Sequence, residues 1–218
     1  MPVPRELRSP IVPQAFPVSA ALGALALLTL LPGWGGAAAV LLGLAVAHLA
    51  FFRNPSRRIP PGEGRVLAPA DGRVVEVVKL DDPDGFVGPA WRVAIFLSIF
   101  DVHVNRAPLS GVVRARRERG AGYQAAFRAE ASERNVQLRL DLETSNGVRA
   151  AVVQITGLVA RRIVCYPDVG GRLVRGEPYG LICYGSRVEV SLPVTAEIRV
   201  RRGDRVRAGE TVIAEIDT

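Results

Sequence analysis

Histidine, cysteine and lysine are scarce in this sequence, and each scarcity excludes a kind of site. The 218 residues include two histidines (His48 and His103), two cysteines (Cys165 and Cys183) and one lysine (Lys79). Two cysteines and two histidines spread along the chain without CxxC spacing do not form a zinc site, so we expect no metal. Without a cleavable secretory pattern, both cysteines are expected to be reduced thiols in a cytosol-facing protein.

Because lysine is so rare, arginine supplies almost all of the positive charge. The 28 basic residues exceed the 21 acidic ones and give a formal net charge of +7. Such a balance suits nucleic acid or an anionic membrane surface, although a GC-rich genome also favours arginine over lysine. The sequence has no recognisable nucleic-acid-binding motif and no aromatic platform, so we expect no nucleic-acid partner.

Charged residues are missing altogether from Ala15 to Phe52. The stretch Pro32-Gly-Trp-Gly-Gly36 interrupts this apolar block and leaves two segments, about 15–32 and 36–52. As helices they would reach about 25–27 Å, slightly less than a hydrocarbon core of roughly 30 Å. Neither segment has the polar face of a soluble surface helix. The block is too long for a signal peptide and ends in arginine, so it predicts a membrane-inserted α-helical hairpin.

Arginines flank this hairpin on both sides, namely Arg5, Arg8, Arg53, Arg57 and Arg58. The positive-inside rule then places both ends of the hairpin in the cytoplasm. We expect residues 1–56 to form the membrane anchor and a Pro-containing linker. Residues 57–218 would form a second domain on the cytoplasmic face of the cell membrane.

The second domain is rich in alternating or β-branched runs separated by turn residues. Strands are expected at 65–67, 72–78, 91–100, 111–117, 136–142 and 148–155, and a short helix or ordered loop at 123–135. Gly176-Glu177 and Gly209-Glu210 form a weak internal echo, each preceded by valine and arginine. Such hairpins recur in barrel-sandwich folds. The fold expected is mainly β, a barrel-sandwich-like domain with few short helices.

His103 is the only histidine outside the apolar block, and it follows the most apolar strand candidate. Asp71, in a Pro-Ala-Asp-Gly turn, and Ser186, directly after Gly185, complete an Asp, His and Ser set whose order in the chain is not diagnostic. A histidine can take a hydroxyl proton while a carboxylate fixes its tautomer. Spacing alone leaves two alternatives open, because a single histidine is often structural and Gly-Ser is a common turn.

Four motifs in order narrow these alternatives: Ala68-Pro-Ala-Asp-Gly72, Phe100-Asp-Val-His-Val-Asn-Arg-Ala-Pro108, Gln154-Ile-Thr-Gly-Leu-Val-Ala-Arg-Arg-Ile163 and Tyr184-Gly-Ser-Arg-Val-Glu-Val190. Together with the hairpin, they make the chain resemble the short form of the phosphatidylserine decarboxylase family. The resemblance covers roughly residues 50–195, and the motifs are highly specific only in combination.

Members of that family are pyruvoyl enzymes, and the resemblance implies the same here. Ser186 would attack the carbonyl of Gly185, and elimination and hydrolysis would leave a pyruvoyl group at residue 186. Fragments 1–185 and 186–218 would remain associated as a heterodimer, with a higher oligomer left open. By resemblance, His103 is the base and Asp71 its orienting carboxylate. The pyruvoyl group would form a Schiff base with phosphatidylserine in the bilayer, which would lose CO2 to give phosphatidylethanolamine.

Three positions depart from the longer family members. The cleavage site has Tyr184 and Arg187 around Gly-Ser where those members have Leu and Thr, and Arg106 replaces a second histidine. Arginine is not a base at neutral pH, so Arg106 either binds the substrate phosphate or carboxylate or is structural. The same choice applies to Arg161 and Arg162, and Ser132-Glu-Arg-Asn135 is expected to line the site.

Two other functions compete with this interpretation. A membrane-tethered serine hydrolase would use Ser186, His103 and Asp71 without cutting its own chain. A non-enzymatic lipoyl- or biotinyl-like carrier would explain the Val206-Arg-Ala-Gly-Glu210 hairpin. Carriers need a lysine at a hairpin tip, however, and Lys79 follows a valine run without the usual Met-Lys pair.

Overall fold

The computed structural model describes residues 3–81, 86, 88–124, 126, 134–157, 162–183 and 186–217. The chain divides into two compact units. One is Arg5–Ser56, and the other is Arg57–Thr218 together with Met1–Pro4. The first unit contains the short 3-10 helices η1 (Arg5–Leu7) and η2 (Pro13–Ala15) and the helices α1 (Phe16–Leu30) and α2 (Gly35–Phe51).

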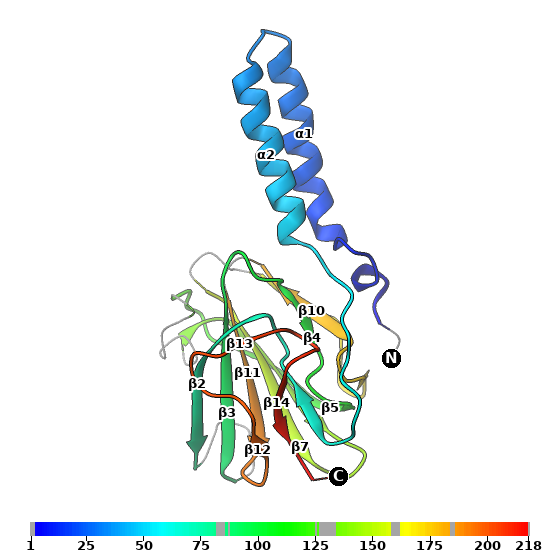
Figure 1. Cartoon of the computed structure of the whole chain (residues 1–218), viewed down its shortest axis with the longest axis vertical. Coiled ribbons are helices and arrows are strands. Elements are labelled where there is room, and N and C mark those ends of the chain that lie inside the picture. The colour runs from blue at the N-terminus through cyan, green and yellow to red at the C-terminus, as the bar shows by residue number, and fades with distance from the viewer. Residues whose placement is uncertain are drawn as a thin grey trace. The chain divides into compact units, whose positions relative to one another are not determined.

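Helices α1 and α2 lie side by side as a hairpin (Figure 1). Pro32 prevents α1 from continuing, and Gly33 adopts a φ of 80° in the turn. Inside the hairpin, the hydroxyl of Ser19 lies 2.9 Å from Nδ1 of His48, which joins the two helices by a polar contact. The predicted helical hairpin is therefore confirmed. The span Pro13–Leu30 is long and apolar enough to cross a membrane by length and composition.

The second unit is built from antiparallel strands. They are β1 (Arg65–Leu67), β2 (Gly72–Leu80), β3 (Ala90–Leu97), β4 (Val104–Arg106), β5 (Gly111–Arg119), β6 (Gln137–Glu143), β7 (Arg149–Ile155), β8 (Ile163–Cys165), β9 (Arg172–Leu173), β10 (Pro178–Ile182), β11 (Ser186–Pro193), β12 (Glu197–Ile198), β13 (Arg205–Val206) and β14 (Val212–Glu215). The large sheet has the order β13-β2-β3-β11-β7-β6-β5-β9. Two small sheets have the orders β1-β14-β12 and β4-β10-β8.

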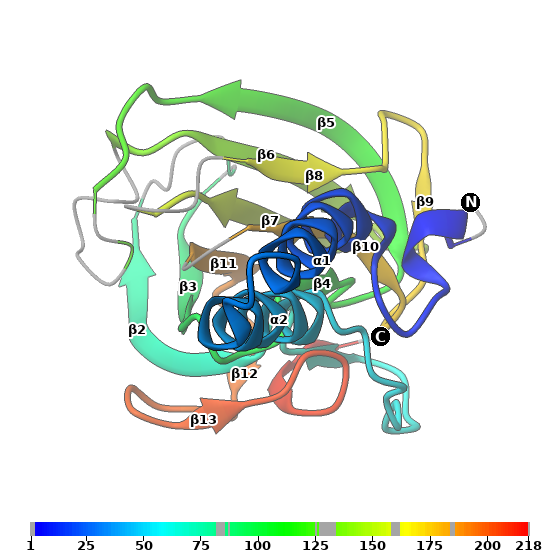
Figure 2. The ribbon, with the colours of Figure 1, turned by 90° about the horizontal axis from the view of Figure 1, so that it is seen from above.

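The large sheet curls from β5 round to β2, as Figure 2 shows from above. Strand β11 lies in its middle, hydrogen-bonded to β3 on one side and to β7 on the other. The core contains fully buried aliphatic side chains from these three strands, among them Val93, Ile95, Val152, Val188 and Val190. The fold is mainly β, as the alternating pattern predicts.

One predicted strand end is wrong. The apolar run from Trp91 to Phe100 suggested a single strand, but β3 ends at Leu97. The carboxylate of Asp101 accepts hydrogen bonds from the backbone N–H and the hydroxyl of Ser98, at 2.8 and 2.7 Å. These two bonds stabilise a turn over Ser98–Asp101 in place of the three further strand residues that were expected, because a side-chain acceptor competes with the strand ladder.

The second unit contains an internal repeat that is more extensive than the similarity between the two glycine-glutamate segments indicated. Ala68-Pro-Ala-Asp-Gly72 leads into β2, and Ala107-Pro-Leu-Ser-Gly111 leads into β5. Both strands then carry an irregularity at the equivalent place, between Val74 and Glu76 and between Val113 and Ala115. The two segments also exchange backbone hydrogen bonds reciprocally, from Leu67 to Pro108 and from Arg106 to Pro69, each at 2.8 Å.

The two glycine turns complete this approximate two-fold symmetry. Gly176 and Gly209 both have positive φ, 79° and 74°. Their N–H groups donate to the carbonyls of Ala107 and Ala68, which are equivalent residues of the two halves. A Cβ atom on Gly209 would lie 3.3 Å from the carbonyl oxygen of Gly176, so the two turns meet. Asp71 and Ser110 therefore occupy equivalent positions.

Candidate active site

Ser186 is the first residue of β11 and pairs with Leu97, the last residue of β3. Its side chain is fully buried, and its Oγ has no hydrogen-bond partner among the residues that the structure describes. Leaving a buried hydroxyl without a partner costs about 1–3 kcal/mol, and such groups call for a functional explanation. Gly185, the other half of the expected cleavage site, lies outside the described residues.

His103 reaches the same end of the sheet through the turn that follows β3. After Leu97 the chain turns over Ser98–Asp101 and runs on to His103. The carbonyl oxygen of His103 accepts a hydrogen bond of 3.3 Å from the N–H of Ile182, in the strand that leads toward Ser186. The segment 97–103 is thus tied to the segment 182–186 at both of its ends. Strand register brings the histidine beside the segment that carries the serine.

The imidazole of His103 is almost completely buried, and its orientation is set by the backbone. Nδ1 lies 2.9 Å from the carbonyl oxygen of Asp101. A carbonyl oxygen only accepts, so Nδ1 carries the proton in this contact and the neutral ring keeps its basic lone pair on Nε2. Asp101 is itself fixed by the two bonds to Ser98. The acceptor that orients His103 is therefore a backbone carbonyl.

Asp71 is held by partners other than His103. Its carboxylate accepts from the Nη2 of Arg57 at 2.7 and 2.9 Å and from the backbone N–H of Ala208 at 2.7 Å. In the other half of the repeat, the hydroxyl of Ser110 accepts from the backbone N–H of Arg175 at 3.0 Å in the same way. No Asp71–His103 hydrogen bond is present among the described residues. The structure thus brings His103 and Ser186 into one neighbourhood and gives Asp71 a place in an arginine cluster.

Arg106 belongs to the same cluster. Its Nη1 donates to the carbonyl oxygen of Gly176 at 3.0 Å, and its side chain passes beneath Gly209. Burial and the nearby charge of Arg57 lower the pKa of Arg106 to about 10, although Asp71 and Glu210 oppose the shift. The guanidinium remains charged at neutral pH. Arg106 consequently places a buried positive charge next to β10, three residues along the chain from His103.

A buried amide pair lies between the two sheets and was missed by the sequence analysis. Nε2 of Gln154 donates to Oδ1 of Asn105 at 2.7 Å, and both side chains are fully buried. Asn105 Nδ2 and Gln154 Oε1 have no hydrogen-bond partner in the described part of the chain. Gln154 pairs with Val188 on the strand that begins with Ser186. Both residues lie within the four motifs, and that membership was the only signal in the sequence.

Asn135 forms hydrogen bonds next to the end of β7, the strand that pairs with β11. Its Nδ2 donates to the backbone carbonyls of Gln124 and Thr156 at 2.8 and 2.7 Å. Arg162 is exposed, and its carbonyl oxygen accepts from the N–H of Cys183 at 3.2 Å. Arg134 is exposed, and the remaining candidates Arg161, Ser132 and Glu133 lie outside the described residues.

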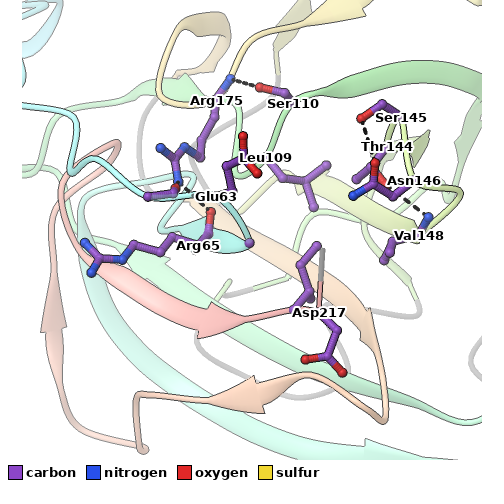
Figure 3. A pocket seen from close by; sticks show the side chains of 13 residues that line it. Glu63, Arg65, Leu109, Ser110, Thr144, Ser145, Asn146, Val148, Arg175 and Asp217 are labelled. Atoms are coloured by element: carbon purple, nitrogen blue, oxygen red, sulfur yellow. Dashed lines mark hydrogen bonds between the residues drawn. The ribbon is translucent and has the colours of Figure 1, made fainter.

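A cavity of about 470 Å³ lies at the opposite end of the large sheet (Figure 3). Its lining includes Ser110, Arg175 and the turn from Thr144 to Val148 between β6 and β7. That turn precedes the residues of β7 that pair with the far end of β11, near Ser191. The guanidinium of Arg175 donates to the backbone carbonyls of Pro60, Gly62 and Arg65, so this arginine fixes the chain leading into β1.

Neither cysteine belongs to a disulfide or a metal site among the described residues. Both are free thiols, and no group of His, Cys, Asp or Glu side chains in the described ranges is arranged to hold a metal ion. Burial raises the pKa of Cys165 to about 12 in spite of the nearby Arg116. Burial also raises the pKa of Cys183.

Comparison with known proteins identifies the family. The family model for phosphatidylserine decarboxylase matches residues 44–214. A phosphatidylserine decarboxylase proenzyme of Symbiobacterium thermophilum is 46% identical over 97% of this chain and 98% of its own length. One from Geotalea daltonii is 40% identical over 94% of this chain and 95% of its own length. The chain therefore belongs to the phosphatidylserine decarboxylase family and is a decarboxylase, as its four motifs predict.

Proposed function

We propose that this protein converts phosphatidylserine to phosphatidylethanolamine and CO2 with a pyruvoyl group made from Ser186. The observation that carries the proposal is the buried Oγ of Ser186, which has no partner among the described residues and lies where strand register brings in His103. The relatives are named as proenzymes, which agrees with a chain that is cut before it acts.

Self-cleavage would use the residues of the chain alone. Nε2 of His103 takes the hydroxyl proton of Ser186 while Oγ attacks the carbonyl carbon of Gly185. The C–N bond breaks, the amine of Ser186 takes a proton, and an ester joins the two residues. Loss of the Ser186 α-proton then releases the carboxylate of Gly185 and leaves a dehydroalanine. This enamine takes a proton on its Cβ, loses one from its nitrogen and becomes an imine. Water hydrolyses the imine, ammonia departs, and residue 186 becomes a pyruvoyl group.

The residues around Ser186 fit such a group. The buried amides of Asn105 and Gln154 each keep one polar atom without a partner in the described part of the chain, and Gln154 pairs with Val188 on the strand that begins with Ser186, so they supply polar groups close to residue 186. A pyruvoyl group supplies an electron sink for the electron pair left when CO2 departs. His103, oriented through Nδ1 by the carbonyl of Asp101, is the proposed proton carrier in both reactions.

Asp71 is proposed to support this site by positioning the charges around it. Its carboxylate fixes Arg57, and Arg57 and Asp71 together set the electrostatic surroundings of Arg106. Arg106 is the proposed binder of the phosphate or carboxylate of the lipid headgroup, since guanidinium groups suit both anions. In this proposal the backbone carbonyl of Asp101 orients His103 directly. Asp71 acts indirectly, through the arginines that it positions.

The fold explains why the two fragments would stay together. The fragment 186–218 contains β11, β12, β13 and β14. Strand β11 is hydrogen-bonded to β3 and β7, β13 to β2, and β14 to β1, all in the larger fragment. A cut before β11 therefore removes one peptide bond and leaves the sheets paired, which supports a stable heterodimer.

The apolar hairpin is proposed to anchor the enzyme to the cell membrane. Residues 1–56 would form the anchor and linker, and residues 57–218 the catalytic domain on the cytoplasmic face. The length and composition of Pro13–Leu30 support membrane association. An anchor of this kind would keep the catalytic domain at the surface where its lipid substrate is found.

A denaturing gel tests the proposal against a serine hydrolase that uses the same residues. The active protein should separate into a large fragment and a 33-residue fragment, 186–218. The Ser186→Ala variant should remain one chain and release no CO2 from phosphatidylserine. An active protein that runs as a single full-length band would rule out the pyruvoyl mechanism and favour the hydrolase.

A further inference from the structure

The turn beside the candidate active site presents two large apolar side chains to solvent. Ile99 is 56% exposed and Phe100 is 81% exposed. Their backbone is held firmly, because Asp101 accepts two hydrogen bonds from Ser98 and its N–H donates to the carbonyl of Ser98 at 3.0 Å. Folding thus holds these side chains outside the core, at a free-energy cost that a partner surface would offset.

This turn is part of the connection that positions the catalytic histidine. It begins directly after Leu97, which pairs with Ser186, and ends two residues before His103. A surface that covers Ile99 and Phe100 would therefore lie next to the site where the substrate must enter.

Strand register gathers exposed arginines at the same end of the sheet. Arg73 pairs with Phe96, one residue before the end of β3. Arg119 pairs with Gln137, which is aligned with Ile155 at the end of β7 that flanks β11. Arg162 precedes β8, and its carbonyl accepts from Cys183. All three side chains are exposed. This end of the second unit therefore combines apolar side chains with positive charge.

The acidic groups nearby offset only part of this charge. Asp101 keeps one negative charge, because its hydrogen-bond donors on Ser98 are neutral, whereas Glu118 lies 3.5 Å from Arg116, which is not one of these three arginines. Asp204 is bonded to Arg201. By contrast, the cavity at the opposite end of the sheet is lined by equal numbers of acidic and basic side chains, namely Glu63, Asp217, Arg65 and Arg175.

We propose that the turn Ser98–Asp101 is a membrane-docking element of the catalytic unit. Phe100 and Ile99 enter the interfacial region of an anionic bilayer, and the arginines around them contact the lipid headgroups. The inference rests on the proposed function, because a lipid substrate has to reach Ser186 from the bilayer. A bilayer is favoured over a protein partner because exposed aromatic and aliphatic side chains at the same end of the sheet as exposed arginines match the apolar interior and anionic surface of a membrane.

Fluorescence quenching tests the docking directly. Phe100→Trp in the full-length chain, reconstituted into phosphatidylcholine–phosphatidylserine vesicles, should gain a fluorescence component that lipids brominated on their acyl chains quench. Val169→Trp is the matched control, because Val169 is 62% exposed in a turn bonded to Val113 at the far end of β5. Trp34 and Trp91 contribute equally to both variants.

The proposal is overturned if the tryptophan at position 100 is quenched no more than the one at position 169. It is also overturned if its emission shifts to the blue without quenching while the particle mass doubles, since a second copy of the chain would then cover the turn. This measurement needs no enzymatic activity, so it stands even if the proposed function fails.

Enzymatic activity on two forms of the substrate provides a second test of docking. The double variant Ile99→Ser, Phe100→Ser should lose roughly tenfold in CO2 release from phosphatidylserine vesicles, the effect expected for one large side chain losing its apolar surroundings. Its activity on a short-chain phosphatidylserine that is dissolved as monomers should stay at the wild-type level, as should self-cleavage. Val169→Ser should match the wild type on both substrates. Equal losses on both substrates would overturn docking, whereas absence of CO2 from the wild type would contradict the proposed function.

Discussion

The backbone N–H of Ile182 donates a hydrogen bond of 3.3 Å to the carbonyl oxygen of His103. This contact ties the histidine to the strand that leads toward Ser186. The partner of Ser186, Leu97, directly precedes the turn before His103. The proposed base and nucleophile are thus held near each other by backbone pairing between strands, and this arrangement does not depend on contacts of flexible side chains. Because the relationship is made by the backbone, the side chain of His103 can be changed without disturbing it.

His103→Gln should slow self-cleavage by about a hundred- to ten-thousand-fold, the usual contribution of a general base. A glutamine fills similar space and donates to the Asp101 carbonyl, but it takes no proton from Ser186. The fraction of cut chain against time, followed on denaturing gels after synthesis in a cell-free system, measures the rate.

The other histidine offers a matched control for this experiment. His48 lies in the hairpin, with Nδ1 next to the hydroxyl of Ser19. His48→Gln should leave the cleavage rate unchanged. A wild-type rate for His103→Gln would show that another group acts as the base.

The repeat makes Asp71 and Ser110 a natural pair for a stability experiment. Ser110→Ala removes one neutral hydrogen bond and should lower the free energy of unfolding by about 1 kcal/mol. Asp71→Ala removes the equivalent bond and also leaves Arg57, whose side chain is 6% exposed, without its closest carboxylate. It should cost about 3 kcal/mol. Denaturant titrations in detergent, in an uncut Ser186→Ala background, measure both changes.

One further variant distinguishes the contribution of the Asp71–Arg57 ion pair from that of the hydrogen bond between Asp71 and the N–H of Ala208. Asp71→Asn keeps an oxygen for the N–H of Ala208 but loses the charge that faces Arg57. Its loss of stability should lie between the other two. If Asp71→Ala and Ser110→Ala cost the same, the ion pair with Arg57 contributes nothing to the fold.

The surroundings of Glu76 predict that the free energy of unfolding decreases in acid. Burial raises its pKa, but hydrogen bonds and charges from Arg92 and Arg187 outweigh burial and hold the pKa below the ordinary value of 4.5. The unfolded carboxylate therefore binds a proton before the folded one does. Its contribution to stability is complete above pH 4.5 and is lost as the pH falls through the lower folded pKa.

The measurement compares unfolding free energies across that window. In the uncut Ser186→Ala background, Glu76→Gln should lower stability near pH 7 and lose this deficit progressively as the pH falls below 4.5. The matched control Glu143→Gln removes a partner of Arg114, an arginine that is more exposed than Arg187. It should show a smaller deficit at neutral pH. A pH-independent deficit for Glu76→Gln would contradict the assigned pKa shift.

Both thiols should be inert in the folded protein, in which Cys165 is half-buried and Cys183 is buried. The pKa of Cys165 is raised to about 12, so almost none of it is thiolate at pH 8. The pKa of Cys183 is raised by burial as well. Mass spectrometry after treatment with iodoacetamide should find both thiols unmodified in native protein and both alkylated after denaturation. Rapid native alkylation of Cys165 would show that the strands β8 and β10 open around it.

The sequence predicted those parts of the fold that depend on local pattern. The uncharged block from 15 to 52 contains α1 and α2, and the β-branched runs correspond to the main strands. The apolar run through Phe100 gave the wrong end for β3, because hydropathy carries no information about the hydrogen bond that the Asp101 carboxylate accepts from the N–H of Ser98. The spacing of Ser98 and Asp101 resembles a capping box and was the available clue.

The site depends on long-range pairing, and local pattern does not contain that information. The four motifs named Ser186, His103 and Asp71 together, but the acceptor that orients His103 is a main-chain carbonyl, which has no residue type to recognise. Asp71 pairs with Arg57, the residue at which the main part of the second unit begins, and nothing in the local pattern indicates that pairing. The repeat that makes Asp71 equivalent to Ser110 is hidden in sequence, since only Ala-Pro and a later glycine are shared.

The mass and N-terminus of the small fragment test the central claim most directly. The account predicts a fragment of residues 186–218 whose mass is one ammonia lower than that of a serine-terminated peptide, with a blocked N-terminus that reacts with a carbonyl reagent. A fragment that begins with an intact Ser186, or an active chain that is never cut, would contradict it.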